Sequence, residues 1–347
     1  MRLTQLRQRL ADFGAKPCHQ DRVLRAWCGS GTLDNRRSRA EDFLPAALRA
    51  DLPAFFAQTE GLVRLVSEHP GGDGSARLLV ALADGRTVES VRLLRQGLCV
   101  STQVGCAVAC RFCMTGRDGL LQQLGSAEIV AQVALARRAR PVRRVVFMGM
   151  GEPAHNLDNV LEAIEFLGTL GGIGHKNLVF STVGDRRVFE RLPAGPVKPA
   201  LALSLHSTFR ERRAALLPKA ADLDPAELLA ESEAYARATG YPLQVQWTLL
   251  AGVNDGDDEA ERLAELLRGR YAMVNFIPYN ANEGLGYQRP SAERCAALVE
   301  TLMRRGILTK LRNSAGQDID GGCGQLRARH LAGEGAGRPL RFSESAG

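Results

Sequence analysis

From about residue 98 onward, segments with the pattern of β-strands alternate with segments of helical periodicity. In the helical segments apolar side chains recur every three or four residues, as at Val160, Ile164 and Leu167. Repeated βα units imply a parallel sheet with helices outside it, either doubly wound or barrel-like. In both architectures the active site lies at the carboxyl ends of the strands. The expected strands cover residues 98–103, 143–149, 177–182, 200–205, 243–250, 272–278 and 307–312.

Two smaller regions are expected before this core. Residues 1–60 are predicted to form a helical accessory domain, in which one helix runs from Phe43 to Phe56. Residues 61–97 contain three partly alternating segments separated by turn signals, which predict an antiparallel β-ribbon. The core then extends over residues 98–330, and residues 331–347 form a tail.

The composition is typical of a globular protein in a reducing compartment. Of the 347 residues, 45% are hydrophobic and 24% are charged, which excludes a largely disordered chain. No apolar run approaches the roughly 20 residues that a membrane helix needs. The N-terminal stretch, MRLTQLRQRLADFG, lacks the apolar segment of a signal peptide. We therefore expect a cytoplasmic protein with no membrane partner, whose eight cysteines are reduced.

The positive charge indicates a polyanionic partner. The net charge is +7, and most of the excess comes from arginine, whose planar fork suits phosphate. Five arginines crowd into residues 137–144. Such a run is usually a solvated face, but on a protein that acts on RNA it is a candidate for phosphate contacts.

Three cysteines lie in one short loop after the first core strand. Cys106, Cys110 and Cys113 are separated by three and two residues. Clustered thiolates in a reduced protein favour a soft metal centre. A structural zinc site would need a distant fourth ligand, and thiols gathered by chance are the other alternative. A 4Fe–4S cluster held by only three cysteines would keep one iron open for a small-molecule ligand.

Polar residues and glycines follow the strands at the edge where the active site is expected. A glycine turn allows a ligand to approach the backbone closely, and a carboxylate beside it can accept hydrogen bonds from an ammonium group. A single Ser or His at a strand end is more often structural, whereas several at successive strand ends favour cofactor contacts. The candidates are Gly151, Glu152, Ser181, Ser204, Leu205, His206 and Asn280.

Two further cysteines are candidates for chemistry. Cys323 lies among glycines in DIDGGCGQL, where a thiol is accessible and not part of a core. Cys99 precedes Cys106 by seven residues and is expected at the base of the first core strand.

The order of these motifs resembles that of the RlmN/Cfr family of radical S-adenosylmethionine RNA methyltransferases. The resemblance spans about residues 85–330, and its most discriminating segment is DIDGGCGQL. It implies a partial (βα)6 TIM-type barrel preceded by a small helical domain. The motifs that carry it are LCVSTQVGCAVACRFCMTG, VVFMGMGEP, SLH, IPYN and DIDGGCGQL.

The resemblance also implies the site and its chemistry. Cys106, Cys110 and Cys113 would hold a 4Fe–4S cluster, and the strand-end residues named above would contact S-adenosylmethionine. Cys323 would accept a methyl group from one S-adenosylmethionine, and cleavage of a second would generate the radical that activates this methyl group. The substrate would be a ring carbon, most specifically C2, of an adenosine in rRNA or tRNA.

The remaining roles implied by the resemblance concern proton and electron transfer. Cys99 would assist proton removal and form a transient disulfide with Cys323, while Glu89 matches the proton acceptor of the family. A flavodoxin or ferredoxin would supply electrons of low potential.

The chain departs from the family pattern at residues 183–185 and at residues 313–317, where ribosomal members usually carry a basic residue near Ala315. Two alternatives therefore stay open. One is an enzyme of the same family that acts on a different RNA or on a substrate other than RNA. The other is a non-catalytic, metal-stabilised RNA-binding protein.

Overall fold

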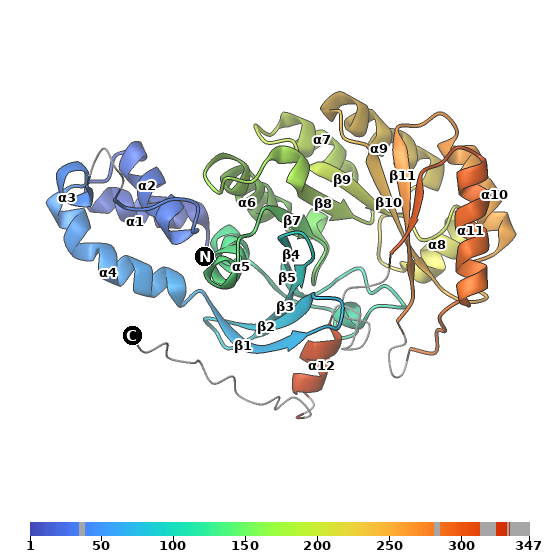
Figure 1. Cartoon of the computed structure of the whole chain (residues 1–347), viewed down its shortest axis with the longest axis horizontal. Coiled ribbons are helices and arrows are strands. Elements are labelled where there is room, and N and C mark those ends of the chain that lie inside the picture. The colour runs from blue at the N-terminus through green and yellow to red at the C-terminus, as the bar shows by residue number, and fades with distance from the viewer. Residues whose placement is uncertain (35–38, 281–284, 313–323, 332, 334–347) are drawn as a thin grey trace.

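The computed structural model describes residues 1–34, 39–280, 285–312, 324–331 and 333. Its largest feature is a ten-stranded sheet, in which the strands follow the order β1-β2-β3-β4-β7-β8-β9-β10-β11-β12 (Figure 1). The sheet curves into a partial barrel (Figure 1). It does not close, because its two end strands, β1 and β12, do not pair with each other.

Seven strands of this sheet pair in parallel, and a helix crosses over between each consecutive two. The first six strands with their helices make the predicted (βα)6 unit, so the predicted fold class is confirmed. The strands are β4 (Gly97–Cys99), β7 (Arg144–Phe147), β8 (Leu178–Thr182), β9 (Ala200–Ser204), β10 (Leu243–Leu249), β11 (Ala272–Pro278) and β12 (Thr309–Leu311). The helices between them are α5 (Ser126–Ala139), α6 (Leu157–Thr169), α7 (Arg186–Ala194), α8 (Arg210–Leu216), α9 (Pro225–Thr239), α10 (Asp257–Leu267) and α11 (Ala292–Arg304).

The three strands predicted before the core extend the same sheet. They are β1 (Val63–Pro70), β2 (Ala76–Leu82) and β3 (Thr87–Leu93). They pair antiparallel, and β3 also pairs antiparallel with β4, so the ribbon continues into the barrel. A separate pair, β5 (Gln103–Gly105) and β6 (Leu120–Gln123), was not expected from the sequence. The expected strand 98–103 is therefore divided between β4 and β5.

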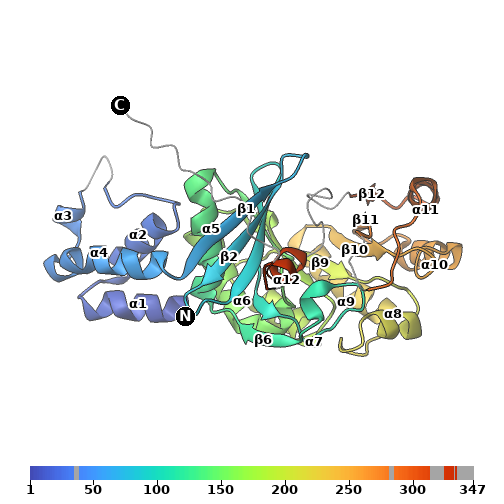
Figure 2. The same ribbon diagram turned by 90° about the horizontal axis from the view of Figure 1, so that it is seen from below.

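The N-terminal residues form helices, as predicted, at one end of the molecule (Figures 1 and 2). They are α1 (Leu3–Asp12), α2 (Pro17–Trp27), α3 (Ala40–Phe43) and α4 (Ala46–Glu60). The single helix expected from Phe43 to Phe56 is wrong, because Leu44 is extended and Pro45 caps α4. A residue before proline is pushed out of the helical conformation, which explains the break.

Side chains alternate between the two faces of the barrel sheet. On β10 and β11 the outward residues, such as Val245 and Val274, join the main apolar core under the helices. The inward residues of the earlier strands form a smaller cluster that includes Cys99, Val146 and Ala202. The inward side chains are thus separate from the main apolar core. The candidate functional side chains lie on this inner face.

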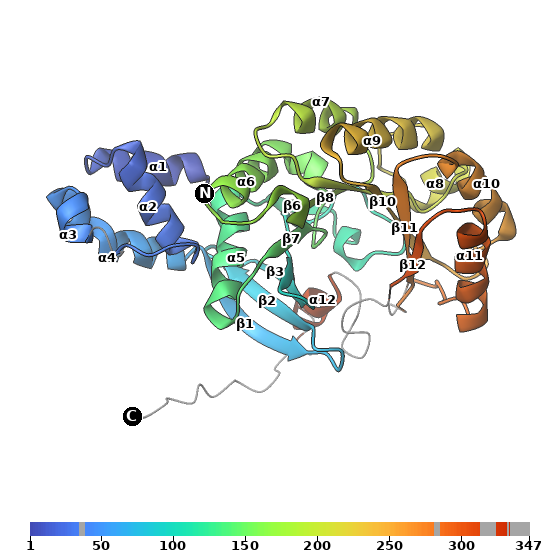
Figure 3. The same ribbon diagram turned by 45° about the horizontal axis from the view of Figure 1, so that its top comes forward.

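The C-terminal part of the described chain is the short helix α12 (Gln325–Leu331), which packs against β3 (Figures 2 and 3). The predicted tail, 331–347, lies outside the described residues except for Leu331 and Gly333. In the described part of the chain, no helix combines the length and apolar character needed to cross a membrane.

Candidate active site

The three clustered cysteines lie in a tightly folded loop between β5 and the 3₁₀ turn η1 (Met114–Gly116). The loop starts at Gly105, where only glycine fits. Its φ is +78°, and a Cβ at this position would clash with the carbonyl oxygen of Gly119. Cys106 belongs to a buried apolar cluster at the carboxyl ends of the strands, and the partly buried Cys110 and Cys113 pack against it. This cluster also contains Val108, Phe112, Val183, Leu216, Leu217, Leu250 and Tyr279.

Burial makes these cysteines poor thiolates on their own. It raises the pKa of Cys106 to about 12, and it also raises the pKa values of Cys110 and Cys113. The neighbouring cysteines raise the pKa values of Cys106 and Cys110 further by charge repulsion. Thiolates in such a place need a compensating metal centre or cation.

Several donors point at the sulfurs. The backbone N–H groups of Val108 and Ala109 approach Cys106, and those of Thr115 and Gly116, with the Thr115 hydroxyl, approach Cys113. Hydrogen bonds to sulfur are one of the means by which proteins tune iron–sulfur clusters. Three cysteines with these donors fit a 4Fe–4S cluster that has one open iron. Among the described side chains no three or more His, Cys, Asp or Glu meet the geometry of a single-ion site, so the fit rests on the loop's donor set.

A buried cation stands beside the loop. Arg213 of α8 is 3% exposed, and its Nη2 donates to the carbonyl oxygen of Val183. Burial lowers the pKa of Arg213 to about 10, whereas Cys110 and Glu152 act to raise it, so the guanidinium stays charged near pH 7. The sequence analysis did not single out Arg213, because it lies in an ordinary charged helical segment.

The glycine turn after β7 brings Glu152 to the same place. Gly151 has a φ of +103°, and a Cβ there would lie 2.6 Å from the Cβ of Gln103. Gln103 fixes the turn by accepting the backbone N–H of Glu152 at 2.8 Å. The Glu152 carboxylate in turn accepts backbone N–H groups of Ala154, at 3.1 Å, and Val183, at 3.0 Å. Burial raises the pKa of Glu152 to about 7.

Ser181, Ser204 and His206 lie at the ends of β8 and β9, as predicted. The hydroxyl oxygens of Ser181 and Ser204 are 3.5 Å apart. His206 has a φ of +62°, and its Nδ1 accepts the backbone N–H of Thr248 at 3.0 Å. Burial lowers the pKa of His206 to about 3, so the ring is neutral, and its edge meets the Phe112 ring with centroids 4.9 Å apart.

The other two predicted cofactor contacts, Leu205 and Asn280, also follow strands, β9 and β11. Leu205 is buried in the main apolar core, so only its backbone faces the site. Asn280 follows β11 as expected, and its Oδ1 accepts Arg289 Nη1 at 3.1 Å.

Glu89 lies inside the barrel on β3, and both of its oxygens are engaged. Oε2 accepts Arg77 Nη1 at 2.9 Å, in an ion pair whose side chains are 3% and 2% exposed. Oε1 accepts the backbone N–H of Arg327, on α12, at 2.9 Å. Glu89 therefore ties the C-terminal helix to the sheet. Arg77 was missed, although a single charge within the apolar segment ARLLVAL was a signal for a buried pair.

Cys99 ends β4 and does not lie at the base of that strand, which corrects the expected position. The strand is shorter than predicted, so its last residue reaches the carboxyl edge. Cys99 is buried on the inner face with Val91 and Val146.

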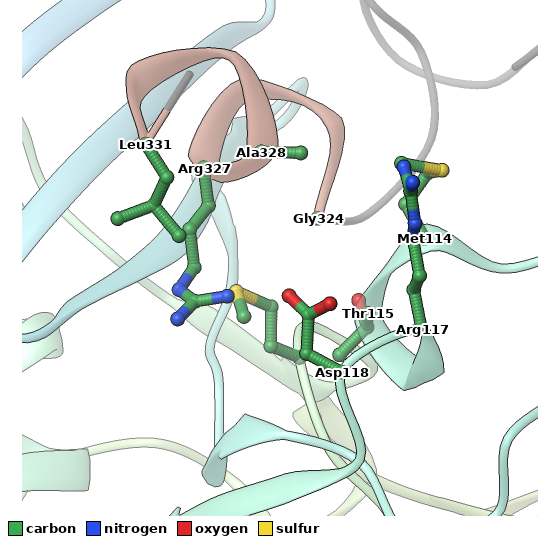
Figure 4. Close-up of a pocket in the computed structure, with 9 residues that line it drawn as sticks. Met114, Thr115, Arg117, Asp118, Gly324, Arg327, Ala328 and Leu331 are labelled. Carbon is green, nitrogen blue, oxygen red and sulfur yellow. The ribbon is translucent and has the colours of Figure 1, made fainter. Parts of the chain in front are cut away.

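Cys323 lies outside the described residues, as do residues 313–317. The next residue, Gly324, has a φ of +90°, and a Cβ there would lie 2.7 Å from the backbone nitrogen of Thr115. Gly324, the first described residue after this gap, therefore packs against Thr115, next to the cysteine loop. A pocket of about 160 Å³ lies between η1 and α12, and Figure 4 shows Arg327 and Asp118 approaching it from opposite walls.

Three of the five arginines of residues 137–144 make contacts within the protein, and the expectation that the group contacts phosphate stays a prediction. Arg137 donates to the carbonyl oxygens of Cys28, Val142 and Gly171. Arg138 pairs with Glu60, and Arg140 donates to the carbonyl oxygen of Leu93. These contacts join the N-terminal helices, α5 and the sheet.

A three-cysteine loop and a glycine–glutamate turn at the carboxyl edge of a partial βα barrel define an enzyme of the radical SAM class. Residues 100–267 match the family model described as Radical SAM superfamily. A solved radical SAM methyltransferase from Sphaerobacter thermophilus has a TM-score of 0.81 and 36% identity, covering 94% of this chain and 98% of that one.

Relatives that are similar over nearly the whole chain show which family within this superfamily the chain belongs to. A probable RNA methyltransferase of Leptothrix cholodnii is 69% identical over 332 residues, which are 96% of each chain. One of Pseudomonas aeruginosa is 66% identical over 335 residues, covering 96% of this chain and 97% of the relative. The chain belongs to the radical SAM superfamily and, within it, to the family of these relatives. It is therefore an enzyme that uses a 4Fe–4S cluster and S-adenosylmethionine.

Proposed function

We propose that this enzyme methylates a ring carbon of adenosine in rRNA or tRNA, most specifically C2, through an S-methyl group on Cys323. The observation that carries the proposal is the packing of Gly324 against Thr115, beside the cysteine loop, because Gly324 directly follows Cys323 in the sequence. The names of the relatives support RNA as the substrate. The order of motifs from the cysteine loop to DIDGGCGQL supports a member of the RlmN/Cfr type.

The cofactor-binding residues have separate tasks in this proposal. Cys106, Cys110 and Cys113 hold the cluster, which when bound supplies the electron for reductive cleavage of S-adenosylmethionine. Glu152 accepts hydrogen bonds from the ammonium group of the methionine moiety, since its carboxylate is already oriented by two backbone N–H groups. The remaining contacts are made by Gly151, Ser181, Ser204, the backbone of Leu205, His206 and Asn280.

The working residues act on the methyl carrier and the base. One S-adenosylmethionine methylates the Cys323 thiolate, and a second is consumed to activate that methyl group, so two are used per turnover. An aromatic ring carbon has no lone pair with which to attack a methyl donor, and covalent catalysis divides the difficult step in two. Glu89 accepts a proton. The Cys99 thiolate attacks the sulfur of Cys323, so the carbon–sulfur bond to the RNA breaks, and its electron pair and a proton complete the methyl group on the base. The resulting disulfide between Cys99 and Cys323 is then reduced by an external thiol before the next turnover.

Electrons reach the cluster from a low-potential donor such as flavodoxin or ferredoxin. The target adenosine must be unpaired or flipped, because the inner face of the barrel is buried.

Nucleoside mass spectrometry tests this function. Separated 23S rRNA and tRNA from cells with and without the gene are digested, and ring-methylated adenosines are quantified. We expect one such nucleoside to disappear without the gene and to return with the wild-type gene, but not with a Cys323→Ala variant. If both RNA pools are unchanged in cells that lack every other member of this family, the RNA assignment is wrong.

The raised pKa of Glu152 predicts a pH dependence of cofactor binding. Below pH 7 the carboxyl group is largely protonated, so binding the ammonium group must first release a proton. We expect the affinity for S-adenosylmethionine to rise about tenfold between pH 6 and pH 8 in equilibrium dialysis of the holoenzyme. His206 stays neutral across this range, because its pKa is about 3, and it cannot cause the change.

Glu152→Gln is the control, and it should bind more weakly without the rise. A rise of equal size in this variant would contradict the assignment. The same shift also affects stability. Because burial raises the folded-state pKa from 4.5 to about 7, the folded protein holds more protons in this window, and stability falls as pH increases through it.

A further inference from the structure

Two buried amide side chains of the barrel have no hydrogen-bond partner within the described part of the chain. Gln246 of β10 is 2% exposed and Asn275 of β11 is 0% exposed. Both the oxygen and the nitrogen of each amide lack a partner. Buried polar groups are nearly always hydrogen-bonded, so four unpaired atoms in two adjacent residues require an explanation.

The alternation of β10 and β11 places both amides on the inner face of the barrel. Val245 and Trp247 flank Gln246 and pack in the outer core, as do Val274 and Phe276 beside Asn275. Gln246 and Asn275 therefore point to the opposite face, which on earlier strands carries Cys99 and Val146.

The register of the strands aligns the amides with proposed cofactor contacts. Gln246 is the Cα partner of Ser204 on β9, and Asn275 is the partner of Gln246. Ser204 in turn lies 3.5 Å from Ser181, oxygen to oxygen. A row of polar side chains thus crosses four neighbouring strands, from β8 to β11.

A third buried amide shows what a structural role looks like in this fold. Gln132 of α5 is 1% exposed, and its oxygen accepts from Ser90 at 2.8 Å and from the backbone of Ser101 at 2.9 Å. Its nitrogen donates to the carbonyl oxygen of Ser101 at 2.9 Å. The contrast with Gln246 and Asn275 indicates that their hydrogen bonds are reserved for a ligand.

We propose that Gln246 and Asn275 bind the hydrogen-bonding edge of the adenine base that enters the barrel for methylation. A carboxamide offers a donor beside an acceptor, which matches an exocyclic amine next to a ring nitrogen, the pairing by which Asn and Gln recognise adenine. The inference rests on the proposed function. Adenine is also part of S-adenosylmethionine. We assign the amides to the substrate because Asn275 lies within β11 on the inner face of the barrel, whereas the proposed cofactor contact Asn280 lies beyond the end of that strand.

The test replaces each amide by an apolar side chain of similar size, in Gln246→Met and Asn275→Leu. The probes are S-adenosylmethionine, and tRNA and 23S rRNA from cells that lack the gene. Three properties of the reconstituted holoenzyme are measured: the melting temperature without RNA, the dissociation constants for both probes, and the transfer of labelled methyl groups to Cys323 and to RNA. Gln244→Met, on the same strand and face, and Gln132→Met are the controls.

We expect each amide variant to bind RNA about tenfold more weakly, as loss of a bidentate base contact implies, and to lose methyl transfer to RNA. Its melting temperature should stay or rise, because no internal hydrogen bond is lost, and methyl transfer to Cys323 should continue. Gln244→Met should match the wild type. Gln132→Met should lower the melting temperature, because it breaks the bonds to Ser90 and Ser101.

Three results would overturn the inference. A fall in melting temperature as large as that of Gln132→Met, with unchanged RNA affinity, would make the amides structural. Loss of S-adenosylmethionine binding alone would assign them to the adenine of the cofactor. Unchanged RNA methylation in both variants would refute the adenine-binding role of the amides and leave the proposed function standing. A wild-type enzyme that neither binds nor methylates either RNA would refute the proposed function and the amide role together.

Discussion

Replacement of Cys113 by alanine is expected to abolish RNA methylation and to prevent assembly of the iron–sulfur cluster. With only Cys106 and Cys110 left, the loop offers two sulfurs, and the backbone and hydroxyl donors at Thr115 and Gly116 lose the atom they approach. The reaction has no path that avoids the electron from the cluster, so activity should fall at least about 10³-fold. The measurements are iron content, visible absorbance after anaerobic reconstitution, and methyl incorporation into RNA.

Cys18→Ala is the matched control for this experiment. Cys18 is exposed on α2 and lies outside the cysteine loop. Its replacement should leave iron content and activity unchanged. Full iron content and activity in Cys113→Ala would remove the loop from the chemistry and favour the alternative of a binding protein without catalysis.

Replacement of Arg77 by alanine is expected to lower the free energy of unfolding more than the loss of any exposed ion pair does. Arg77 and Glu89 are almost completely buried, and the substitution takes the guanidinium away from the Glu89 carboxylate. Removing one partner of a buried pair typically costs about 3–5 kcal/mol, because the other charge stays buried. The free energy of unfolding is measured by denaturant titration of the holoenzyme under anaerobic conditions.

The same change should loosen α12, because Glu89 also holds the backbone N–H of Arg327. Faster proteolysis near residues 324–331 would report this loss separately from global unfolding. Arg186→Ala is the control, since its pair with Glu227 is 63% and 62% exposed, and an exposed pair contributes at most about 1 kcal/mol.

The double variant Arg77→Met with Glu89→Gln removes both charges. It should recover most of the stability lost in Arg77→Ala, although not the activity, if Glu89 accepts a proton. Equal losses of stability in Arg77→Ala and Arg186→Ala would show that the buried pair does not hold the C-terminal helix.

Most of the barrel could be predicted because its signals are local. Each core strand is a short apolar run, and each helix has its own periodicity, so the order of elements followed from neighbouring residues alone. Glu152 and His206 were found in the same way, since they directly follow strands whose carboxyl ends meet at one edge.

Features that depend on contacts between distant segments were predicted poorly. The pairing of β5 with β6 divides an expected strand. Arg137 looked like part of a charged surface, but it donates to three carbonyl groups from other segments. Two of these carbonyl groups, on Cys28 and Gly171, lie 109 and 34 residues from Arg137 in the sequence, too far to leave a local pattern.

The sequence by itself determined the class of fold, the three-cysteine loop and the glycine–glutamate turn, because spacing along the chain decides which residues share a loop or a strand end. Only the tertiary structure decided what surrounds them. It brought Arg213 to the loop, tied α12 to Glu89 of β3, and left Gln246 and Asn275 without a hydrogen-bond partner among the residues that the structure describes. Burial, charge pairing and hydrogen bonding between remote segments depend on distances in space, which a linear pattern does not contain.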